Sequence, residues 1–483
     1  MALNPIKKSA AELLDLSRDE RAVLWTQVAA SAEAYLDRVS TYPIHAVLTP
    51  AQAGELLRPF DFKKAVDPGD ALRFVTDGLS RYAIHTSHPR YFGLFNPASS
   101  AMGIFADALT AAYNPQLVTW NSSSFAVALE QHLLRSFGER FGYERGKTDG
   151  TFTSGGAEAN HTALLTALVS RFPEFDQKGV RALEGQPVFY TTAESHHSLR
   201  KAARCCGLGT DAVVEIPADR DFKMDVAALR ARIKSDRELG RKPFLIVATA
   251  GTTNGGAIDP LQALADIATE HNLWYHVDAA WGGAAVLVPE LQAVLSGIER
   301  ADSITFDAHK WLSLPMGAGM YLTRHPGILE KTFHISASYM PAKTESEATD
   351  PYTHSLQWSR RFIGLKLFLT LAAAGWKGYA EVIAHQAAMG ALLKRLLEES
   401  RWKAVNSTPL PVICFTDTSR PDGSDSVYLD QIAARINDGG EAWISTTRLA
   451  GRPVLRACIC NYRTTAEDVR SLVNSLNAIR TLI

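Results

Sequence analysis

The stretch Ser303-Ile-Thr-Phe-Asp-Ala-His-Lys-Trp-Leu-Ser-Leu-Pro315 places a lysine just after a short run of β-branched and aromatic residues. Such a run predicts a buried β-strand, so Lys310 is expected at the edge of a sheet and not on a solvated surface. An amine in partly apolar surroundings loses affinity for its proton and becomes a usable nucleophile for an aldehyde. The stretch therefore indicates a reactive lysine.

An aspartate ends a second predicted strand, in Leu273-Trp-Tyr-His-Val-Asp-Ala-Ala-Trp-Gly-Gly283. Pyridoxal 5'-phosphate (PLP) requires a lysine that binds its aldehyde and a carboxylate that pairs with its pyridine nitrogen. Lys310 and Asp278 supply these two groups, each at the end of a strand. Their combination predicts PLP as the cofactor.

Short apolar runs alternate with helical segments between residues 150 and 325. We expect strands at 187–191, 212–216, 244–249, 274–277 and 303–306, separated by helices at 198–205, 226–234 and 261–271. Continuous apolar strands separated by helices indicate a mostly parallel sheet that is covered on both faces. The expected fold class is therefore α/β, with ligands at the carboxyl ends of the strands.

The pattern divides the chain into three parts. Residues 1–100 are mostly helical and show no core of their own, so we expect an N-terminal segment that buries its apolar stripe on a second copy, in a homodimer. Residues 101–370 would form a large PLP-binding α/β domain. Residues 371–483 would form a small α+β domain, with a helix at 379–399, strands at 411–415 and 454–459, and a closing helix at 466–479.

A glycine-containing loop runs into a helix in Thr151-Phe-Thr-Ser-Gly-Gly-Ala-Glu-Ala-Asn160. Glycines let backbone N–H groups approach an anion closely, and the N-terminus of a helix adds a favourable dipole. On its own such a loop is more often a plain helix start. Together with Lys310 and Asp278, we interpret it as a phosphate-binding loop.

Two adjacent histidines stand in Ala193-Glu-Ser-His-His-Ser-Leu-Arg-Lys201. Neighbouring side chains diverge and the sequence indicates no third ligand, so we expect no metal site. One histidine stacked on the flat face of a pyridine ring is the functional interpretation. A polar cluster at a helix start is the alternative.

The composition argues against several classes of protein. Fifty Lys and Arg nearly balance 51 Asp and Glu, so there is no overall basic field for nucleic acid or an anionic membrane. The longest apolar run, residues 362–376, is too short to span a membrane, and no signal peptide is visible. The five cysteines lack zinc or disulfide spacing, so we interpret them as packing residues and expect a cytoplasmic location.

These motifs, in this order and spacing, resemble those of the fold-type-I PLP enzymes. The resemblance is greatest to the group II amino-acid decarboxylases, which include the aromatic amino-acid, glutamate, histidine and diaminobutyrate decarboxylases. It covers essentially the whole chain, including His88-Pro-Arg-Tyr-Phe-Gly93 and Ser359-Arg-Arg-Phe-Ile-Gly-Leu-Lys366. It implies an aspartate-aminotransferase-like fold, a carboxy-lyase activity, and a homodimer with its active sites at the subunit interface.

The resemblance also implies roles for single residues. Lys310 would bind PLP covalently, Asp278 would pair with the ring nitrogen, and His196 would stack on the ring. The other cofactor contacts would come from Gly156, Ala157 and His309 at the phosphate, from Ala280 on the opposite ring face, and from Thr253.

The sequence departs from relatives at two of these positions. Relatives often have a hydroxyl residue where Ala157 stands, so the phosphate there would depend on backbone donors. Asp307 replaces an asparagine that is common in the animal aromatic decarboxylases. A carboxylate beside a phosphate would repel it, so we expect Asp307 to be turned away or paired.

The reaction needs a group that protonates the substrate Cα after carbon dioxide leaves. Tyr352 lies in a polar loop between Lys310 and Arg360, where the family carries a mobile catalytic tyrosine. The resemblance therefore implies that Tyr352 is the proton donor. His354 is the alternative.

The sequence does not decide which amino acid is the substrate. Phe92, Phe95 and Trp120 suggest an aromatic-lined pocket and so favour an aromatic L-amino acid, but they could equally be aromatics of the core or of an interface. A diaminobutyrate or acidic amino-acid decarboxylase, a PLP-dependent aldehyde synthase and an aminotransferase are alternative activities. A PLP fold without turnover is the remaining alternative.

Overall fold

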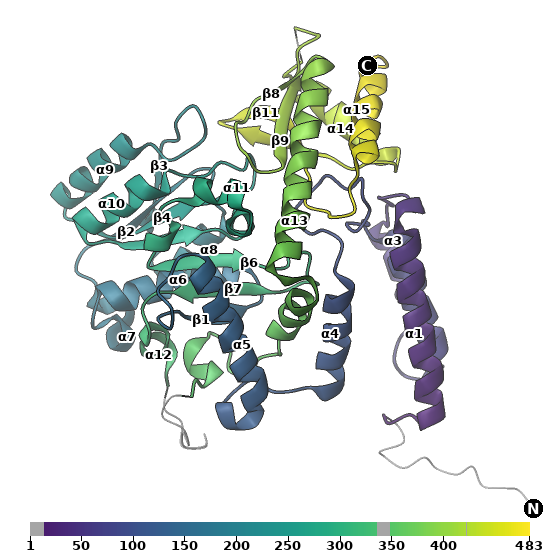
Figure 1. Ribbon diagram of the computed structural model, residues 1–483, viewed down its shortest axis with the longest axis horizontal. Coiled ribbons are helices and arrows are strands. Elements are labelled where there is room, and N and C mark those ends of the chain that lie inside the picture. Colours follow the sequence, from purple (N-terminus) through teal and green to yellow (C-terminus); the bar gives the residue numbers. More distant parts are fainter. Residues whose placement is uncertain (1–13, 336–347, 422) are drawn as a thin grey trace, which may run out of the picture.

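The computed structural model describes residues 14–335, 348–421 and 423–483. At its centre is a seven-stranded sheet with the order β1-β7-β6-β5-β4-β2-β3 (Figure 1). Its strands are β1 (Asp149–Thr153), β2 (Pro187–Thr192), β3 (Val213–Ile216), β4 (Lys242–Thr249), β5 (Trp274–Asp278), β6 (Ser303–Asp307) and β7 (Gly319–Thr323). Neighbours from β6 to β3 pair in parallel, and β7 runs antiparallel to both β1 and β6. The predicted, mostly parallel α/β sheet is confirmed.

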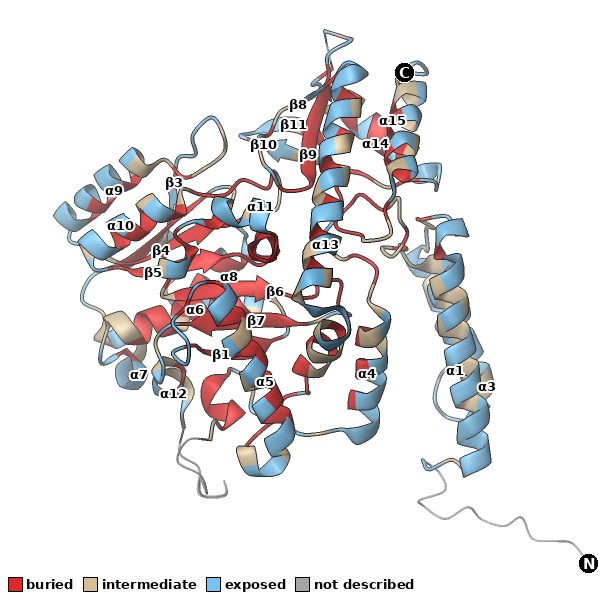
Figure 2. Ribbon diagram, in the orientation of Figure 1, coloured by how far each residue is buried: buried red, intermediate tan, exposed pale blue. Residues whose placement is uncertain are grey.

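Helices cover both faces of this sheet because its strands are apolar on both sides. In β4, Leu245 and Val247 belong to one hydrophobic cluster, whereas Ile246 and Ala248 belong to another. Residues of α6 and α8 pack in the first cluster, and residues of α5, α9 and α10 pack in the second. These helices are α5 (Trp120–Arg140), α6 (Gly156–Arg171), α8 (Ser198–Cys205), α9 (Val226–Glu238) and α10 (Leu261–His271). The red strands between partly blue helices in Figure 2 show the same layering.

A second, four-stranded antiparallel sheet forms in the C-terminal part, with the order β10-β11-β9-β8. Its strands are β8 (Trp402–Ala404), β9 (Val412–Asp417), β10 (Ser445–Leu449) and β11 (Arg452–Cys458), and α14 (Ser426–Asp438) and α15 (Ala466–Arg480) pack on it. The long helix α13 (Gly364–Glu399) links this sheet to the central one. It begins earlier than the predicted residue 379 because the apolar run before that residue is also helical, with a break at Gly375 (φ 66°).

The N-terminal helices form an arm at one side of the molecule (Figure 1). They are α1 (Arg18–Arg38), α2 (Pro50–Leu57) and α3 (Pro68–Tyr82), followed by α4 (Ala101–Tyr113), which packs on α13. No residue of α1, α2 or α3 is buried in the single chain. The helical character predicted for residues 1–100 is confirmed for the described part, whereas the division into three domains stays a prediction.

Two smaller expectations can be compared with the structure. Cys414, Cys458 and Cys460 are buried packing residues, but Cys205 is exposed, so its interpretation as a packing residue was wrong. Cys205 is the last residue of the short helix α8, whose buried residues are Ser198, Leu199, Ala202 and Ala203. Among the described residues, no helix is long and apolar enough to cross a membrane. The cytoplasmic location stays a prediction.

Candidate active site

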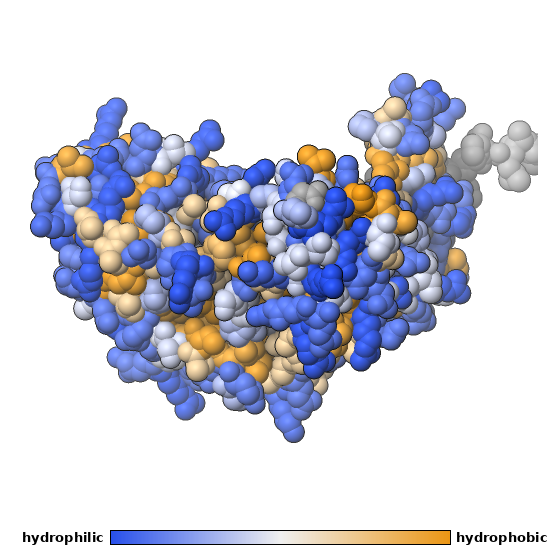
Figure 3. Space-filling model, turned by 90° about the horizontal axis from the view of Figure 1, so that it is seen from above, coloured by the Kyte–Doolittle hydropathy of each residue, from blue (hydrophilic) through white to orange (hydrophobic). Residues whose placement is uncertain are grey.

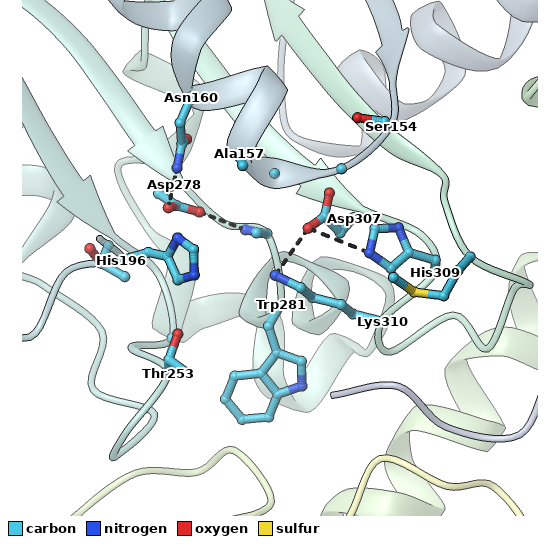
Figure 4. A pocket seen from close by; sticks show the side chains of 16 residues that line it. Ser154, Ala157, Asn160, His196, Thr253, Asp278, Trp281, Asp307, His309 and Lys310 are labelled. Carbon is cyan, nitrogen blue, oxygen red and sulfur yellow. Dashed lines mark hydrogen bonds and ion pairs between the residues drawn. The ribbon is translucent and has the colours of Figure 1, made fainter. Parts of the chain in front are cut away.

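A cavity of about 330 Å³ opens at the carboxyl ends of the central strands (Figure 4). The segments that follow β1, β2, β4, β5 and β6 all contribute to its wall because these five strands point the same way. The lining residues include the sequence-predicted Gly156, Ala157, His196, Thr253, Asp278, Ala280, His309 and Lys310. The structure therefore brings together eight of the twelve residues that the sequence singled out.

Lys310 follows β6 by three residues and reaches into the cavity (Figure 4). Its Nζ lies 3.0 Å from Oδ2 of Asp307, the last residue of β6, whose side chain is only 2% exposed. The Lys310 amine is therefore held by an ion pair. The apolar neighbours that the sequence predicted are not its only surroundings. Asp307 is paired, as expected.

Asp278 ends β5, and both of its carboxylate oxygens accept hydrogen bonds. The backbone N–H of Ala280 donates to Oδ1 over 3.1 Å, and Nδ2 of Asn160 donates to Oδ2 over 2.8 Å. A carboxylate held at both oxygens points in a fixed direction, because rotation would break one of the two bonds. A fixed direction is what a carboxylate needs if it is to pair with a protonated ring nitrogen.

His196 lies between β2 and α8, with its ring open to the cavity. The backbone N–H of Ser198 donates to its Nδ1 over 3.2 Å, so Nδ1 is an acceptor and the neutral ring carries its proton on Nε2. Partial burial lowers the pKa of His196, and the nearby Asp278 carboxylate opposes this shift. A lowered pKa favours the neutral ring, a state that suits stacking on an aromatic ring.

The N-terminus of α6 lies on the other side of the cavity. Its N-cap, Gly155, has no side chain that could cap the first N–H groups, and Gly156 and Ala157 line the cavity. A Cβ on Gly156 would lie 2.8 Å from Asp307 Oδ2, so only glycine allows this close approach. Uncapped backbone N–H groups at the positive end of a helix form a site for an anion.

His309 adds a donor beside this helix end. The backbone N–H of Ala318 donates to His309 Nδ1 over 2.9 Å, which places the proton of the neutral ring on Nε2. Burial lowers the pKa of His309, and Asp307 opposes this shift. His309 Nε2 lies 3.9 Å from Asp307 Oδ2, so its N–H group faces the same region of the cavity as that carboxylate.

Four predicted residues do not line the cavity of this chain. Phe92 is fully buried in the core of the C-terminal sheet, and Phe95 stacks behind the wall residue Trp281 with a centroid distance of 4.2 Å. Trp120 begins α5 and donates its backbone N–H to Asp350. These placements agree with the alternative that the sequence left open, in which the three residues are aromatics of the core. Their roles in substrate binding stay predictions.

Tyr352 is the fourth of these residues. It is buried in the short helix η7 (Pro351–His354), its backbone N–H donates to the Val118 carbonyl, and its ring lies 4.9 Å from that of Trp358. The alternative donor, His354, contacts Asp149 and Thr353 and does not line the cavity either. The proton-donor role of Tyr352 stays a prediction.

Several residues at the site were not among the sequence-predicted ones, and three of them matter most here. Asn160 and Trp281 line the cavity, and Arg456 of β11 donates from Nε to the backbone oxygen of Thr253 over 3.1 Å. Asn160 could have been found, because it lies one helical turn after Gly156 and so faces the same way. Arg456 could not, because its partner is some 200 residues away in sequence.

The side chains and backbone groups of the cavity fit PLP. The uncapped helix start, with His309, is suited to the phosphate, and Lys310 is suited to the aldehyde. Asp278 and His196 lie on the opposite side from His309 (Figure 4), where the ring nitrogen and ring face would be held. These groups match the three chemical features of the cofactor.

Comparison with known proteins gives a consistent result. Residues 66–417 match the pyridoxal-dependent decarboxylase conserved domain. The chain is 28% identical to the aromatic-L-amino-acid decarboxylase of Bacillus atrophaeus over 476 residues, which is 97% of each protein. A crystal structure of Oryza sativa TDC with PLP and tryptamine superposes with a TM-score of 0.90, at 25% identity over 96% of this chain and 99% of that one. Mouse CSAD superposes with a TM-score of 0.86, at 26% identity over 95% of this chain and 98% of that one.

Proposed function

The chain belongs to the pyridoxal-dependent decarboxylase family and catalyses PLP-dependent decarboxylation of an amino acid, and we propose that its substrate is a free aromatic L-amino acid. The observation that best supports this reaction is that Lys310, Asp278 and the uncapped start of α6 line the same cavity. The aromatic substrate is supported by the Bacillus atrophaeus relative and by the tryptamine in the Oryza sativa structure. Trp281, in the cavity wall, offers an aromatic surface.

Each residue of the cavity has a separable task in this proposal. When bound, PLP supplies an aldehyde that links to amino groups and a ring that withdraws the electron pair left on Cα as carbon dioxide departs. Lys310 holds the cofactor through Nζ, and Asp278 holds a proton on the ring nitrogen. His196 presents its flat face to the ring, and the α6 N–H groups with His309 hold the phosphate.

We also propose that the protein is a homodimer. The arm helices have no buried residue, and their apolar side chains include Val23, which is 67% exposed, and Trp25. Figure 3 shows apolar surface on the arm at the upper right. On the body, Tyr113 and Phe125 are also exposed, beside an apolar cavity of about 500 Å³. A second copy would bury both surfaces.

The activity is tested by incubating the PLP-loaded protein with a panel of L-amino acids and measuring carbon dioxide and amine. We expect turnover of aromatic substrates and little turnover of glutamate or 2,4-diaminobutyrate. Hydrogen peroxide and ammonia formed in stoichiometric amounts would indicate an aldehyde synthase instead. Carbon dioxide release from acidic substrates alone would overturn the aromatic assignment.

The dimer is tested by analytical ultracentrifugation of the wild type and of Phe125→Glu. Phe125 is 77% exposed on α5, so a charge there should dissociate the dimer without disturbing the core. Leu239→Glu, at a position after α9 that is 69% exposed, is the matched control and should stay dimeric. A wild-type protein that sediments as an active monomer would contradict the proposal.

A further inference from the structure

Asn160 lies at the centre of a buried hydrogen-bond network beneath the cavity. It is 1% exposed, and its side-chain amide has a partner for each of its groups. Nδ2 lies 2.8 Å from Asp278 Oδ2 and 2.9 Å from Ser198 Oγ. Oδ1 lies 2.8 Å from Thr305 Oγ1 and 3.1 Å from His276 Nε2. Figure 4 shows Asn160 pointing at Asp278 from α6.

The chemistry of these partners fixes which atom donates in each bond. An ionised carboxylate only accepts, so the amide nitrogen of Asn160 must face Asp278. The amide oxygen then faces Thr305 and His276, and both must donate to it. His276 therefore carries its proton on Nε2.

The network continues from His276 away from the cavity. With Nε2 protonated, the Nδ1 atom of His276 accepts from Ser303 Oγ over 2.8 Å. Ser303 in turn accepts from Trp274 Nε1, which can only donate, over 2.9 Å. Complete burial lowers the pKa of His276 to about 4, in agreement with a neutral ring that has one N–H. Every bond from Trp274 to Asn160 therefore points in the same direction.

A branch from Asn160 reaches the second functional side chain. Ser198 Oγ accepts from Asn160 Nδ2, so the hydroxyl proton of Ser198 is directed to His196 Nδ1, 2.8 Å away. The backbone N–H of Ser198 also points at this atom. Both donors hold the proton of His196 on Nε2. The network thus ends at the two side chains that we propose to contact the cofactor ring.

We propose that Asn160 is a positioning residue of the reaction, because it orients the Asp278 carboxylate and, through the Ser198 hydroxyl, adds a second donor that keeps the proton of His196 on Nε2. The inference deepens the proposed function and rests on the roles given there to Asp278 and His196. Without the Asn160 amide, Asp278 keeps the Ala280 bond alone and can rotate. Its hold on the proton of the ring nitrogen would weaken, and so would the electron withdrawal on which the reaction depends.

The test compares Asn160→Ala with Thr166→Val. Thr166 is a matched control because it is buried on the same helix and bonds Tyr321 and helix carbonyls, outside the network. In Asn160→Ala we expect kcat to fall by about 10- to 100-fold, a range typical of partners that orient an active-site ligand, with KM changed by less than about threefold. Thr166→Val should match the wild type in both constants. A kcat for Asn160→Ala equal to that of the control would overturn the proposal.

A second measurement does not depend on turnover. Histidine-selective nitrogen NMR of the full-length protein should report neutral His276 and His196, each with its proton on Nε2. In Asn160→Ala we expect the His196 signal to shift, because the Ser198 hydroxyl loses the donor that directs its proton to His196 Nδ1, whereas the Ser198 backbone N–H still keeps the ring proton on Nε2. Asn160→Asp has nearly the same size and replaces the Nδ2 donor by an acceptor, so it should impair kcat at least as much. Unchanged His196 signals in both variants would contradict the network.

Asp278→Asn separates failure of this inference from failure of the proposed function. If Asp278→Asn turns over normally, the role proposed for Asp278 is wrong, whatever Asn160 does. If Asp278→Asn is inactive and Asn160→Ala behaves as the control, only the positioning role of Asn160 is wrong. Loss of kcat in both variants is the expected result.

Discussion

Lys310 Nζ and Asp307 Oδ2 form an ion pair 3.0 Å long inside the cavity, next to the start of α6. The amine that we assign to the cofactor aldehyde and a carboxylate that would repel the cofactor phosphate are therefore held together. Binding of PLP would change this pair, because the Lys310 amine would become part of the covalent link. The carboxylate then stays close to the helix end that we assign to the phosphate. This position has measurable consequences for cofactor affinity.

Asp307→Asn should tighten binding of PLP and of inorganic phosphate to the cofactor-free protein. The change removes a buried negative charge beside the proposed phosphate site at almost constant volume, and it leaves Lys310 without its anionic partner. Both effects favour an incoming anion, and we expect at least about a tenfold lower Kd, which corresponds to about 1.4 kcal/mol. Isothermal titration calorimetry measures this. Asp302→Asn, just before the other end of β6, is the control, and weaker binding by Asp307→Asn would show that the carboxylate helps to hold the cofactor.

Lys310→Ala should abolish the covalent link to PLP. Borohydride treatment followed by mass spectrometry of peptides should locate the reduced cofactor on Lys310 in the wild type and on no peptide of the variant. Turnover should be lost in the same variant, because no amine remains to hold the aldehyde. The control is Lys201→Ala, on α8, which should label and turn over normally. A labelled peptide that contains Lys201 or Lys331 would place the reactive lysine elsewhere.

Tyr352→Phe tests the proton donor that the family resemblance implied. A general acid typically contributes about 10²–10⁴ to a rate, so loss of the phenol should slow amine formation by that factor if Tyr352 acts in this way. In the described structure the ring packs on Trp358, and the residue does not line the cavity of its own chain. The role of Tyr352 stays a prediction, so we expect Tyr352→Phe to show this slowing of about 10²–10⁴, and a change in kcat below about threefold would contradict it. A slowing of the larger size, absent in His354→Gln, would identify Tyr352 as the donor.

The parts of the fold that the sequence predicted are those whose signals are local. Helices α8 and α10 begin and end at the predicted residues, and β4, β5 and β6 contain the predicted apolar runs and extend them by one or two residues. The strands β1 and β7 were missed because Asp149-Gly-Thr-Phe-Thr153 has glycine or threonine at three of five positions, and Gly319-Met-Tyr-Leu-Thr323 has an apolar run of only three residues. These two strands pair with each other across a long stretch of sequence, and such pairing leaves no local pattern.

The same distinction applies to the site. Lys310 and Asp278 lie at the ends of recognisable strands, so their convergence followed from the topology of a parallel sheet. The Gly155–Gly156 loop follows the unrecognised strand β1 and was found from its glycines and the helix that it begins. Phe92 could not be placed in this way. Its backbone bonds Trp443 and Cys458, so it belongs to the C-terminal sheet although it lies in the N-terminal fifth of the chain. Only the three-dimensional structure separates an aromatic residue of that core from one in the cavity wall.

His276 should make the stability of the protein depend on pH in a way that one substitution removes. Burial lowers its pKa to about 4, whereas an unfolded histidine has a pKa of about 6.5. Between these values the unfolded state binds more protons than the folded state, so the free energy of unfolding is fully retained above about pH 6.5 and falls as the pH is lowered toward 4. The loss attributable to this residue is about 3 kcal/mol.

Denaturant titrations of the wild type and of His276→Gln at pH 7.5, 6 and 4.5 measure this loss. The difference in the free energy of unfolding between the two proteins should shrink as the pH is lowered. His132→Gln, exposed on α5, controls for loss of a histidine in general and should follow the wild type at every pH. If His276→Gln kept the full acid sensitivity of the wild type, the neutral His276 that orders the network around Asn160 would be excluded.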